Sequence, residues 1–204
     1  MYRFFFECML NTAKPIILAS RSPRRIHLLR QIGLSFTVQE SGVDEHIDDG
    51  VGPEEAVRKL SFEKASHVAG RLRTGIVIGA DTIVVLDGEI LGKPASKEEA
   101  ITMLSRLGGR THTVFTGFAL VDVESKKSLV DYERTDVTFR RLGKEEIENY
   151  VQSGSPMDKA GAYGIQDDYG AVFVEKISGC FYTVVGFPLS KFYTSLNMFL
   201  EQLA

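Results

Sequence analysis

The sequence predicts an α/β fold built around one twisted, mixed β-sheet that is flanked by helices. β-rich apolar runs and helical segments alternate along the chain, without an internal repeat or a low-complexity segment. The 204 residues, 44% of them hydrophobic and 25% charged, are enough for one sizeable domain or for two lobes that share a core.

The first third of the chain predicts strand, helix, strand and helix in that order. The apolar run "PIILAS" is a short strand, and "SPRRIHLLRQIGL" is a helix with Ser22 as N-cap and Pro23 in the first helical position. A second strand is expected in "SFTVQES". The long helix "GPEEAVRKLSFEKASHVAGRL" carries Pro53 and two glutamates at its positive end.

The remaining elements follow from turn residues and periodicity. Two β-rich runs, "GIVIGADTIVVLDGEIL", are joined by an Asp87-Gly88 turn, and "SKEEAITMLSRLGG" is a capped helix. A long hairpin is expected in "THTVFTGFALVDVESKKSLVDYERTDVTFR", with its turn near residues 124–128. It is followed by the helix "GKEEIENYVQSG", the glycine-bearing loop "SPMDKAGAYGIQDDYG", the strand "AVFVEKI" and the closing helix "PLSKFYTSLNMFLEQL".

Composition excludes several classes of protein. A net charge of −3 argues against a nucleic-acid or membrane-surface binder, and no apolar run reaches the roughly 18 residues of a membrane span. The two cysteines form no CxxC pair, which fits a reducing compartment, and we expect the cytoplasm. Residues 1–12 are expected to be a disordered extension that is not a signal peptide, with Met9 as an alternative start, and residues 13–204 to be a single domain.

The stretch "LASRSPRR" places two arginines, Arg24 and Arg25, at the positive end of a helix dipole. An anion would make this arrangement favourable, because backbone N–H groups, the Ser20 and Ser22 hydroxyls and the guanidinium groups together form a phosphate site. The alternative is that both arginines point into solvent and bind nothing, and this stretch alone leaves both interpretations open.

In "IVIGADT" an apolar strand runs into Asp81, which we interpret as a functional carboxylate at a strand end. A carboxylate in an apolar setting is costly unless it is paired or binds a metal. A turn or capping role is a poor explanation, because more strand follows in "IVVLDG".

Two loops carry candidate ligand-binding residues. Lys93 lies between Gly92 and Pro94, where it could meet a phosphate as a point charge. In the late loop, Lys159 supplies charge and Gln166 supplies a paired donor and acceptor suited to a base edge. A solvated lysine and an ordinary flexible loop remain the alternatives. Asp44 and Glu45, in the acidic segment "VDEHIDD", could join Asp81 around a hard cation such as Mg²⁺, and a solvated acidic loop is the alternative.

These residues together predict metal-assisted chemistry on a polyphosphate.

Five stretches of the chain, between about Ile17 and Leu189, carry a family resemblance: "LASRSPRR", "GADTIVVLDGEILGKP", "GGRTHTVFTG", "TDVTFRRL" and "PMDKAGAYGIQ". In this order they resemble the Maf family of nucleoside triphosphate pyrophosphatases.

The resemblance implies hydrolysis of a nucleoside triphosphate between its α and β phosphates, with a divalent cation, Mg²⁺ or Mn²⁺, as cofactor. It also implies an elongated fold of two lobes with a deep cleft, similar to that of inosine triphosphatases. By position, Asp81 matches the catalytic carboxylate of the family. The family's polar cleft residues correspond to Ser20, Arg24, Arg25, Glu45, Lys64 and Lys93. Without the resemblance, Lys64 is a solvated mid-helix lysine.

Within the family, the combination of Arg24, Thr82 and Gln166 resembles the branch that acts on dTTP and UTP, including modified pyrimidine nucleotides. The sequence departs from the family pattern at Asp167-Asp168-Tyr169 and at Thr183, where asparagine is frequent. The expected partner is a small-molecule nucleotide, not nucleic acid or a membrane, and a homodimer is left open. The alternative is a nucleotide-binding regulator of septum formation with little catalysis.

Overall fold

The structure is a computed structural model that describes residues 12–48, 50–166 and 169–203. The expected extension at residues 1–12, apart from Thr12, lies outside this part of the chain, and so do Met9, Asp167 and Asp168.

In this part of the chain, seven strands form one sheet in the order β2-β1-β3-β5-β6-β7, and β4 pairs with β3. The strands are β1 (Ile16–Leu18), β2 (Thr37–Val38), β3 (Ile76–Leu86), β4 (Glu89–Leu91), β5 (Thr111–Asp122), β6 (Ser128–Phe139) and β7 (Val174–Ser178). The helices are α1 (Pro23–Gln31), α2 (Pro53–Ala69), α3 (Lys97–Leu107), α4 (Lys144–Gln152), α5 (Phe181–Val185) and α6 (Leu189–Leu203). Parallel pairs join β1 to β2 and β3, whereas β4 and β7 pair antiparallel, so the predicted mixed sheet is confirmed.

The chain divides into two compact units. The first unit comprises residues 1–81, 117–132 and 186–204, and the second comprises residues 82–116 and 133–185. The three long strands β3, β5 and β6 each contribute residues to both units.

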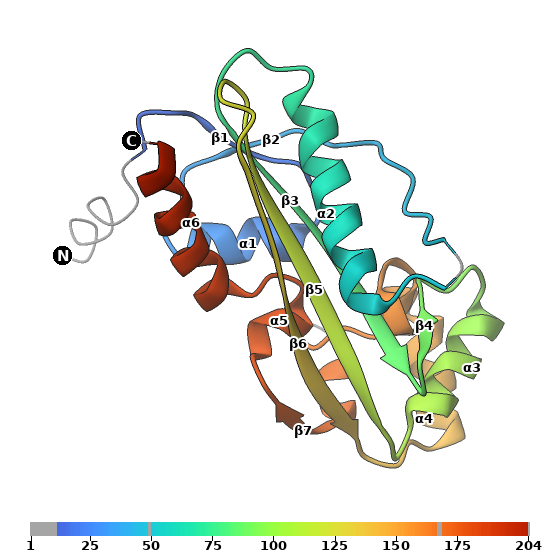
Figure 1. The fold of residues 1–204 in the computed structure, drawn as a ribbon. Helices are drawn as coiled ribbons and strands as arrows, with labels where there is room; N and C mark the ends of the chain where they lie inside the picture. The colour runs from blue at the N-terminus through green and yellow to red at the C-terminus, as the bar shows by residue number, and fades with distance from the viewer. Residues whose placement is uncertain (1–11, 49, 167–168, 204) are drawn as a thin grey trace. The chain divides into compact units, whose positions relative to one another are not determined.

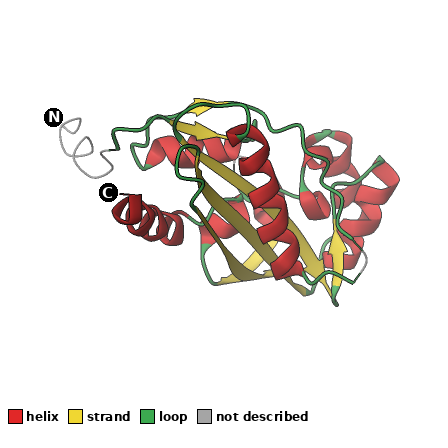
Figure 2. Ribbon diagram, turned by 45° about the horizontal axis from the view of Figure 1, so that its top comes forward, coloured by secondary structure: helices red, strands yellow, loops and turns green. Residues whose placement is uncertain are grey.

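In the first unit, helix α2 covers one face of the sheet, and α1 and α6 lie on the other face (Figures 1 and 2). Two strand glycines allow α2 to lie close to the sheet. A Cβ on Gly79 would overlap the Ser61 carbonyl oxygen, and a Cβ on Gly117 would overlap the Val57 carbonyl. On the opposite face, Phe118 of β5 packs edge-to-face with Phe192 of α6 at 5.6 Å between ring centroids.

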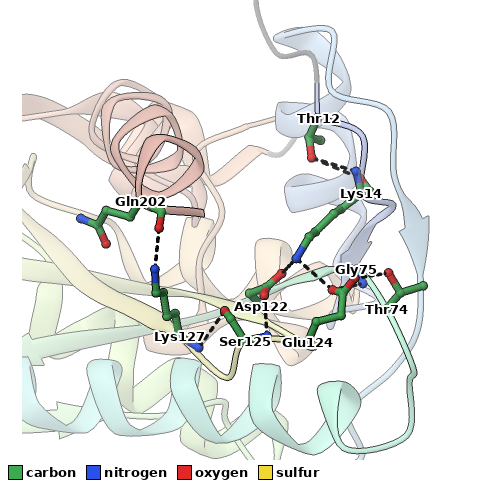
Figure 3. Close-up of polar contacts among 9 residues, drawn as sticks. All are labelled: Thr12, Lys14, Thr74, Gly75, Asp122, Glu124, Ser125, Lys127 and Gln202. Atoms are coloured by element: carbon green, nitrogen blue, oxygen red, sulfur yellow. Dashed lines mark hydrogen bonds and ion pairs between the residues drawn. The ribbon is translucent and has the colours of Figure 1, made fainter. Parts of the chain in front are cut away.

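A polar network closes one end of this unit (Figure 3). The Lys14 ammonium lies 2.6 Å from Asp122 Oδ1 and 3.0 Å from Glu124 Oε2. Glu124 also accepts a hydrogen bond from the Thr74 hydroxyl, and Asp122 accepts one from the Ser125 amide. The network therefore ties the segment before β1 to the β5–β6 turn.

In the second unit, α3 and α4 pack together against the ends of β3, β5 and β6. The core of the second unit comprises Val84, Leu86, Leu104, Val114, Val137, Phe139, Ile147, Tyr150 and Phe173, among others. His112 is buried among these side chains and hydrogen-bonds through Nε2 to the Tyr163 hydroxyl at 2.8 Å.

Most predicted elements are confirmed, and the differences are local. The predicted strand in "SFTVQES" is only two exposed residues long, because it pairs at the sheet edge with the three-residue β1. Strand β7 begins at Val174, after a 3₁₀ turn over Tyr169–Phe173. Helix α5 is not predicted by its sequence, "FYTVV", because aromatic and β-branched residues favour strands. Among the described residues, none of the helices has the length and apolar content needed to cross a membrane.

Candidate active site

The first turn of α1 lacks the groups that normally balance a helix N-terminus. Ser22 occupies the N-cap position, but its side chain makes no cap hydrogen bond, and the turn contains no acidic residue. Ser22 is therefore the N-cap residue, as predicted, but the predicted hydrogen bond between its side chain and the helix is absent. Its amide instead donates to Ser20 Oγ at 3.2 Å. The positive end of α1 is left without a neighbouring carboxylate in its own turn.

Arg25 adds a fixed cation to this helix start. Its Nη1 donates to Ser20 Oγ at 3.3 Å, and its Nε donates to the Gly186 carbonyl at 3.0 Å. Burial lowers the pKa of Arg25, the charges of Asp81 and Glu45 raise it, and Arg24 lowers it again. A guanidinium stays protonated in proteins, so Arg25 remains a cation. Arg24 lies half-buried beside it in the same turn.

Lys64 of α2 connects two acidic residues of the first unit. Its ammonium lies 2.6 Å from Asp81 Oδ1 and 2.6 Å from Glu45 Oε1. The Lys64 and Asp81 side chains are only 6% and 8% exposed, whereas Glu45 is 45% exposed. The interpretation of Lys64 as a solvated helix residue is therefore wrong. Of the residues that the family resemblance indicated, the structure brings Lys64, Asp81 and Glu45 into contact.

A sequence signal for the burial of Lys64 was present. Val57, Leu60, Lys64 and Val68 follow one another at helical spacing, and all four are buried. The lysine therefore occupies the apolar stripe of α2. Gly79 lies two residues before Asp81, on the same face of β3, and lets that stripe reach the strand.

Asp81 lies in the middle of the eleven-residue strand β3, so its placement at a strand end was wrong. The continuous apolar sequence on both sides of Asp81 explains why one strand forms. Thr82 follows Asp81, and successive strand residues point to opposite faces. The Thr82 hydroxyl accordingly contacts the Thr116 hydroxyl of β5 at 3.0 Å, a contact that the sequence did not reveal.

The other predicted site residues belong to the second unit. Lys93 is exposed, directly after Gly92. The Gly92 carbonyl accepts a hydrogen bond of 3.0 Å from Gly161, which adopts a left-handed conformation (φ 68°) and packs on Val84. This bond ties the late loop to the Lys93 segment.

Lys159 and Gln166 of the late loop differ in whether their polar side-chain atoms have partners. The Lys159 ammonium lies 2.7 Å from Asp158 Oδ1 and contacts the Ser155 carbonyl, so its charge is partly balanced within its own turn. The Gln166 amide oxygen is buried and has no hydrogen-bond partner within the described part of the chain. Because a buried polar atom normally has a partner, this oxygen is suited to receive a hydrogen bond from a ligand.

Comparison with known proteins identifies the family. The model of Maf-like proteins matches residues 15–199. The chain belongs to the Maf family. A dTTP/UTP pyrophosphatase of Desulforamulus reducens is 48% identical over 186 residues, which cover 91% of this chain and 97% of the relative. The dTTP/UTP pyrophosphatases of Pelotomaculum thermopropionicum (50% identity; 91% and 97% coverage) and Symbiobacterium thermophilum (51%; 90% and 93%) are similar to the same extent.

Solved structures agree with the fold of this Maf chain. A HAM1 protein from Coxiella burnetii matches with a TM-score of 0.50 and 19% identity, covering 90% of this chain and 98% of the other. The Ham1 protein of Staphylococcus aureus gives a TM-score of 0.50 and 18% identity, with 94% and 100% coverage. At this level of identity the likeness concerns the α/β fold alone.

Proposed function

We propose that the chain hydrolyses dTTP, UTP and modified pyrimidine nucleoside triphosphates to the monophosphate and pyrophosphate, thereby removing non-standard nucleotides. The near full-length relatives named dTTP/UTP pyrophosphatases support this proposal. The observation that carries it is the buried contact of Lys64 with Asp81 and Glu45, in the unit that also holds the Arg25 helix start. A cytoplasmic location and a small-molecule substrate, not nucleic acid, belong to the same proposal.

The helix start binds phosphate in this proposal. Ser20, Arg24 and Arg25 surround the positive end of α1, where backbone and side-chain donors favour an anion. Arg25 is oriented by the Gly186 carbonyl before any ligand arrives, so little side-chain freedom is lost on binding. A fixed guanidinium stabilises the charge that develops on phosphate oxygens.

Asp81 is the group that accepts a proton from the attacking water. Its side chain is held by the Lys64 ammonium through Oδ1. General base catalysis requires a carboxylate in a fixed position, and the contact with the Lys64 ammonium fixes the Asp81 side chain. Lys64 orients Asp81 and offsets one of the two negative charges of Asp81 and Glu45.

The acidic residues also fit a Mg²⁺ or Mn²⁺ ion. The described residues contain no group of three or more His, Cys, Asp or Glu side chains placed to hold a metal, which excludes a complete protein cage within that part of the chain. Mg²⁺ is usually bound by one or two carboxylates together with water and substrate phosphates. Glu45 and Asp81, two oxygen ligands joined by one lysine, match that pattern. When bound, such an ion supplies charge neutralisation on the phosphates.

The second unit holds the remaining candidate substrate-binding residues of this proposal. Thr82 follows the catalytic carboxylate in sequence, and the buried oxygen of Gln166 is suited to accept a hydrogen bond from the substrate. Lys93 and Lys159 supply positive charge on two segments that the Gly161–Gly92 hydrogen bond joins.

The test is to incubate the purified protein with dTTP, UTP and 5-methyl-UTP in the presence of Mg²⁺ or Mn²⁺ and to assay pyrophosphate. We expect pyrophosphate from these nucleotides and a loss of at least about a thousandfold in kcat for Asp81→Asn. Asp87→Asn, in the exposed turn at the end of the same strand, is the matched control and should retain activity. Nucleotide binding without pyrophosphate release would instead indicate a regulator and overturn the proposal.

A further inference from the structure

The Lys64 ammonium lies where a cation shared by Asp81 and Glu45 would lie. Its Nζ is 2.6 Å from Asp81 Oδ1 and 2.6 Å from Glu45 Oε1, so one charge bridges both side chains. The lysine belongs to the apolar stripe of α2, with Leu60 and Val68 buried one turn before and one turn after it. Packing and charge together therefore hold the ammonium in this position.

A metal ion bound to these same two oxygens would lie close to the ammonium. Mg²⁺ binds oxygen ligands at about 2.1 Å, so an ion on Asp81 Oδ1 and Glu45 Oε1 would come within about 5 Å of Lys64 Nζ. Two cations at that distance repel each other, and more strongly in a buried setting than in water. Lys64 and a free metal ion therefore compete for one pair of carboxylates.

The neighbouring charges also disfavour a free divalent cation. Burial has the largest effect on the pKa of Arg25 and lowers it, but the charges of Asp81 and Glu45 raise it. Arg25 therefore lies within the field of the same two carboxylates. Two cations, Lys64 and Arg25, thus face two anions, and Arg24 adds a further positive charge. This set of five described residues has no surplus negative charge to attract a dication.

A triphosphate reverses this balance. It brings several negative charges to the α1 helix start, where Ser20 and Arg25 offer donors to an anion. Phosphate oxygens are also the ligands that usually complete the coordination of Mg²⁺ when a protein supplies only one or two carboxylates. A dication that arrives with the nucleotide therefore meets enough negative charge to lie near Lys64, whereas a free dication does not.

We propose that Lys64 is a resident counter-ion that keeps free Mg²⁺ or Mn²⁺ from binding to Asp81 and Glu45 until a nucleotide supplies its phosphates. This inference rests on the proposed function and concerns the order of binding in the same site. The protein receives the metal ion together with the triphosphate, and the protein without nucleotide binds the ion only weakly.

The experiment measures Mn²⁺ binding without nucleotide, by electron paramagnetic resonance of the free ion. Lys64→Met removes the competing charge and should tighten Mn²⁺ binding at least about tenfold relative to the unsubstituted protein. Mn²⁺ should also raise the unfolding temperature of Lys64→Met, because a ligand that binds the folded state stabilises it. The unfolding temperature of the unsubstituted protein should change little. A merely structural role of Lys64 would not produce a gain in metal affinity.

Two further variants show whether the gain arises at this site. Lys59→Met is the matched control, because it removes the same charge from an exposed lysine of α2 that lies 2.6 Å from Asp48. It should leave Mn²⁺ binding unchanged, and an equal gain in Lys59→Met would overturn the inference. Adding Asp81→Asn to Lys64→Met removes one of the two carboxylates and should abolish the gain, so a gain that persists would also overturn it.

Tight Mn²⁺ binding by the unsubstituted protein, or unchanged affinity in a folded Lys64→Met protein, would contradict the competition. Should Lys64→Met fail to fold, Lys64→Gln replaces it and must show the same gain, because its amide is neutral but still donates a hydrogen bond.

The proposed function is tested separately, by pyrophosphate release from dTTP and UTP in the unsubstituted protein. Unchanged Mn²⁺ affinity in the Lys64 variants of an active protein rejects the role of Lys64 alone. A gain in affinity without pyrophosphate release from the unsubstituted protein rejects the proposed catalysis alone.

Discussion

The Lys64 ammonium lies 2.6 Å from Asp81 Oδ1, and both side chains are more than nine-tenths buried. Two buried charges are tolerated only as a pair, because either one alone would lose its hydration without compensation. The contact therefore matters for folding as well as for chemistry.

Replacing Lys64 by methionine should lower both stability and turnover. The buried Asp81 carboxylate loses its closest cation, at a cost of about 3 kcal/mol in the free energy of unfolding. Turnover should fall by at least about a hundredfold, because the carboxylate is no longer oriented. Urea denaturation and pyrophosphate release measure the two effects. The control is Lys59→Met, an exposed lysine of the same helix paired with Asp48, which should change neither. Identical behaviour of the two variants would contradict the role of Lys64.

Gly79→Ala tests the close approach of α2 to the sheet. The added Cβ overlaps the Ser61 carbonyl, so α2 must shift and carry Lys64 away from Asp81. We expect a loss of about 3 kcal/mol in stability together with reduced turnover. Gly70→Ala, at the end of the same helix in a right-handed conformation with ordinary contacts, should be nearly neutral. A fully stable and active Gly79→Ala protein is the outcome that would rule out this packing.

The contact between Lys14 and Asp122 predicts how stability changes at acidic pH. Burial raises the pKa of Asp122, but hydrogen bonds from Lys14 and Ser125 outweigh burial and hold the pKa below its ordinary value of 3.8. A carboxyl whose pKa is lower in the folded state stabilises the protein above about pH 4, and this stabilisation is lost as the pH falls further.

Lys14→Met should therefore make the protein unfold at a higher pH during acid titration, followed by circular dichroism. Lys127→Met provides the comparison, because Lys127 donates to the Gln202 carbonyl and not to a carboxylate (Figure 3). If both variants unfold at the same pH, the Lys14 contact does not set acid stability.

His112 predicts a second, separate pH dependence. Burial lowers its pKa from 6.5 to about 4. Between pH 6.5 and pH 4 the imidazole of His112 is protonated in the unfolded chain and neutral in the folded protein. The free energy of unfolding should therefore fall by about 3 kcal/mol over this range. His112→Phe should flatten this part of the profile, whereas His27→Asn, on the exposed side of α1, should not. Denaturant titrations at half-unit pH steps provide the measurement, and an unchanged slope in His112→Phe would falsify the assignment.

Local sequence signals predicted the order of elements well. The Ser96 cap of α3, the Asp87-Gly88 turn and the long β5–β6 hairpin all appear where turn chemistry and periodicity place them. Two differences have separate causes. Asp81 lies inside one long strand because the sequence on both sides of it is apolar. The helical state of Phe181–Val185 is instead decided by tertiary packing, which a short sequence window does not contain.

For the site, the arginines and Asp81 could be selected from residue chemistry, but their partners could not. Lys64 is in phase with the apolar stripe of α2, and that pattern would have indicated its burial. No comparable signal exists for the Gly186 carbonyl, because its contact with Arg25 joins two segments that are distant in sequence.

The hydrogen bond from Arg25 to the Gly186 carbonyl joins the first helix to the segment that enters the last one. For protein engineering, this contact limits where the chain may be opened. New termini between Gly186 and Pro188, as in a circular permutant, would release the peptide group that orients Arg25. An opening at the exposed Asp87-Gly88 turn would leave that peptide group in place and is the better position for inserting a reporter domain.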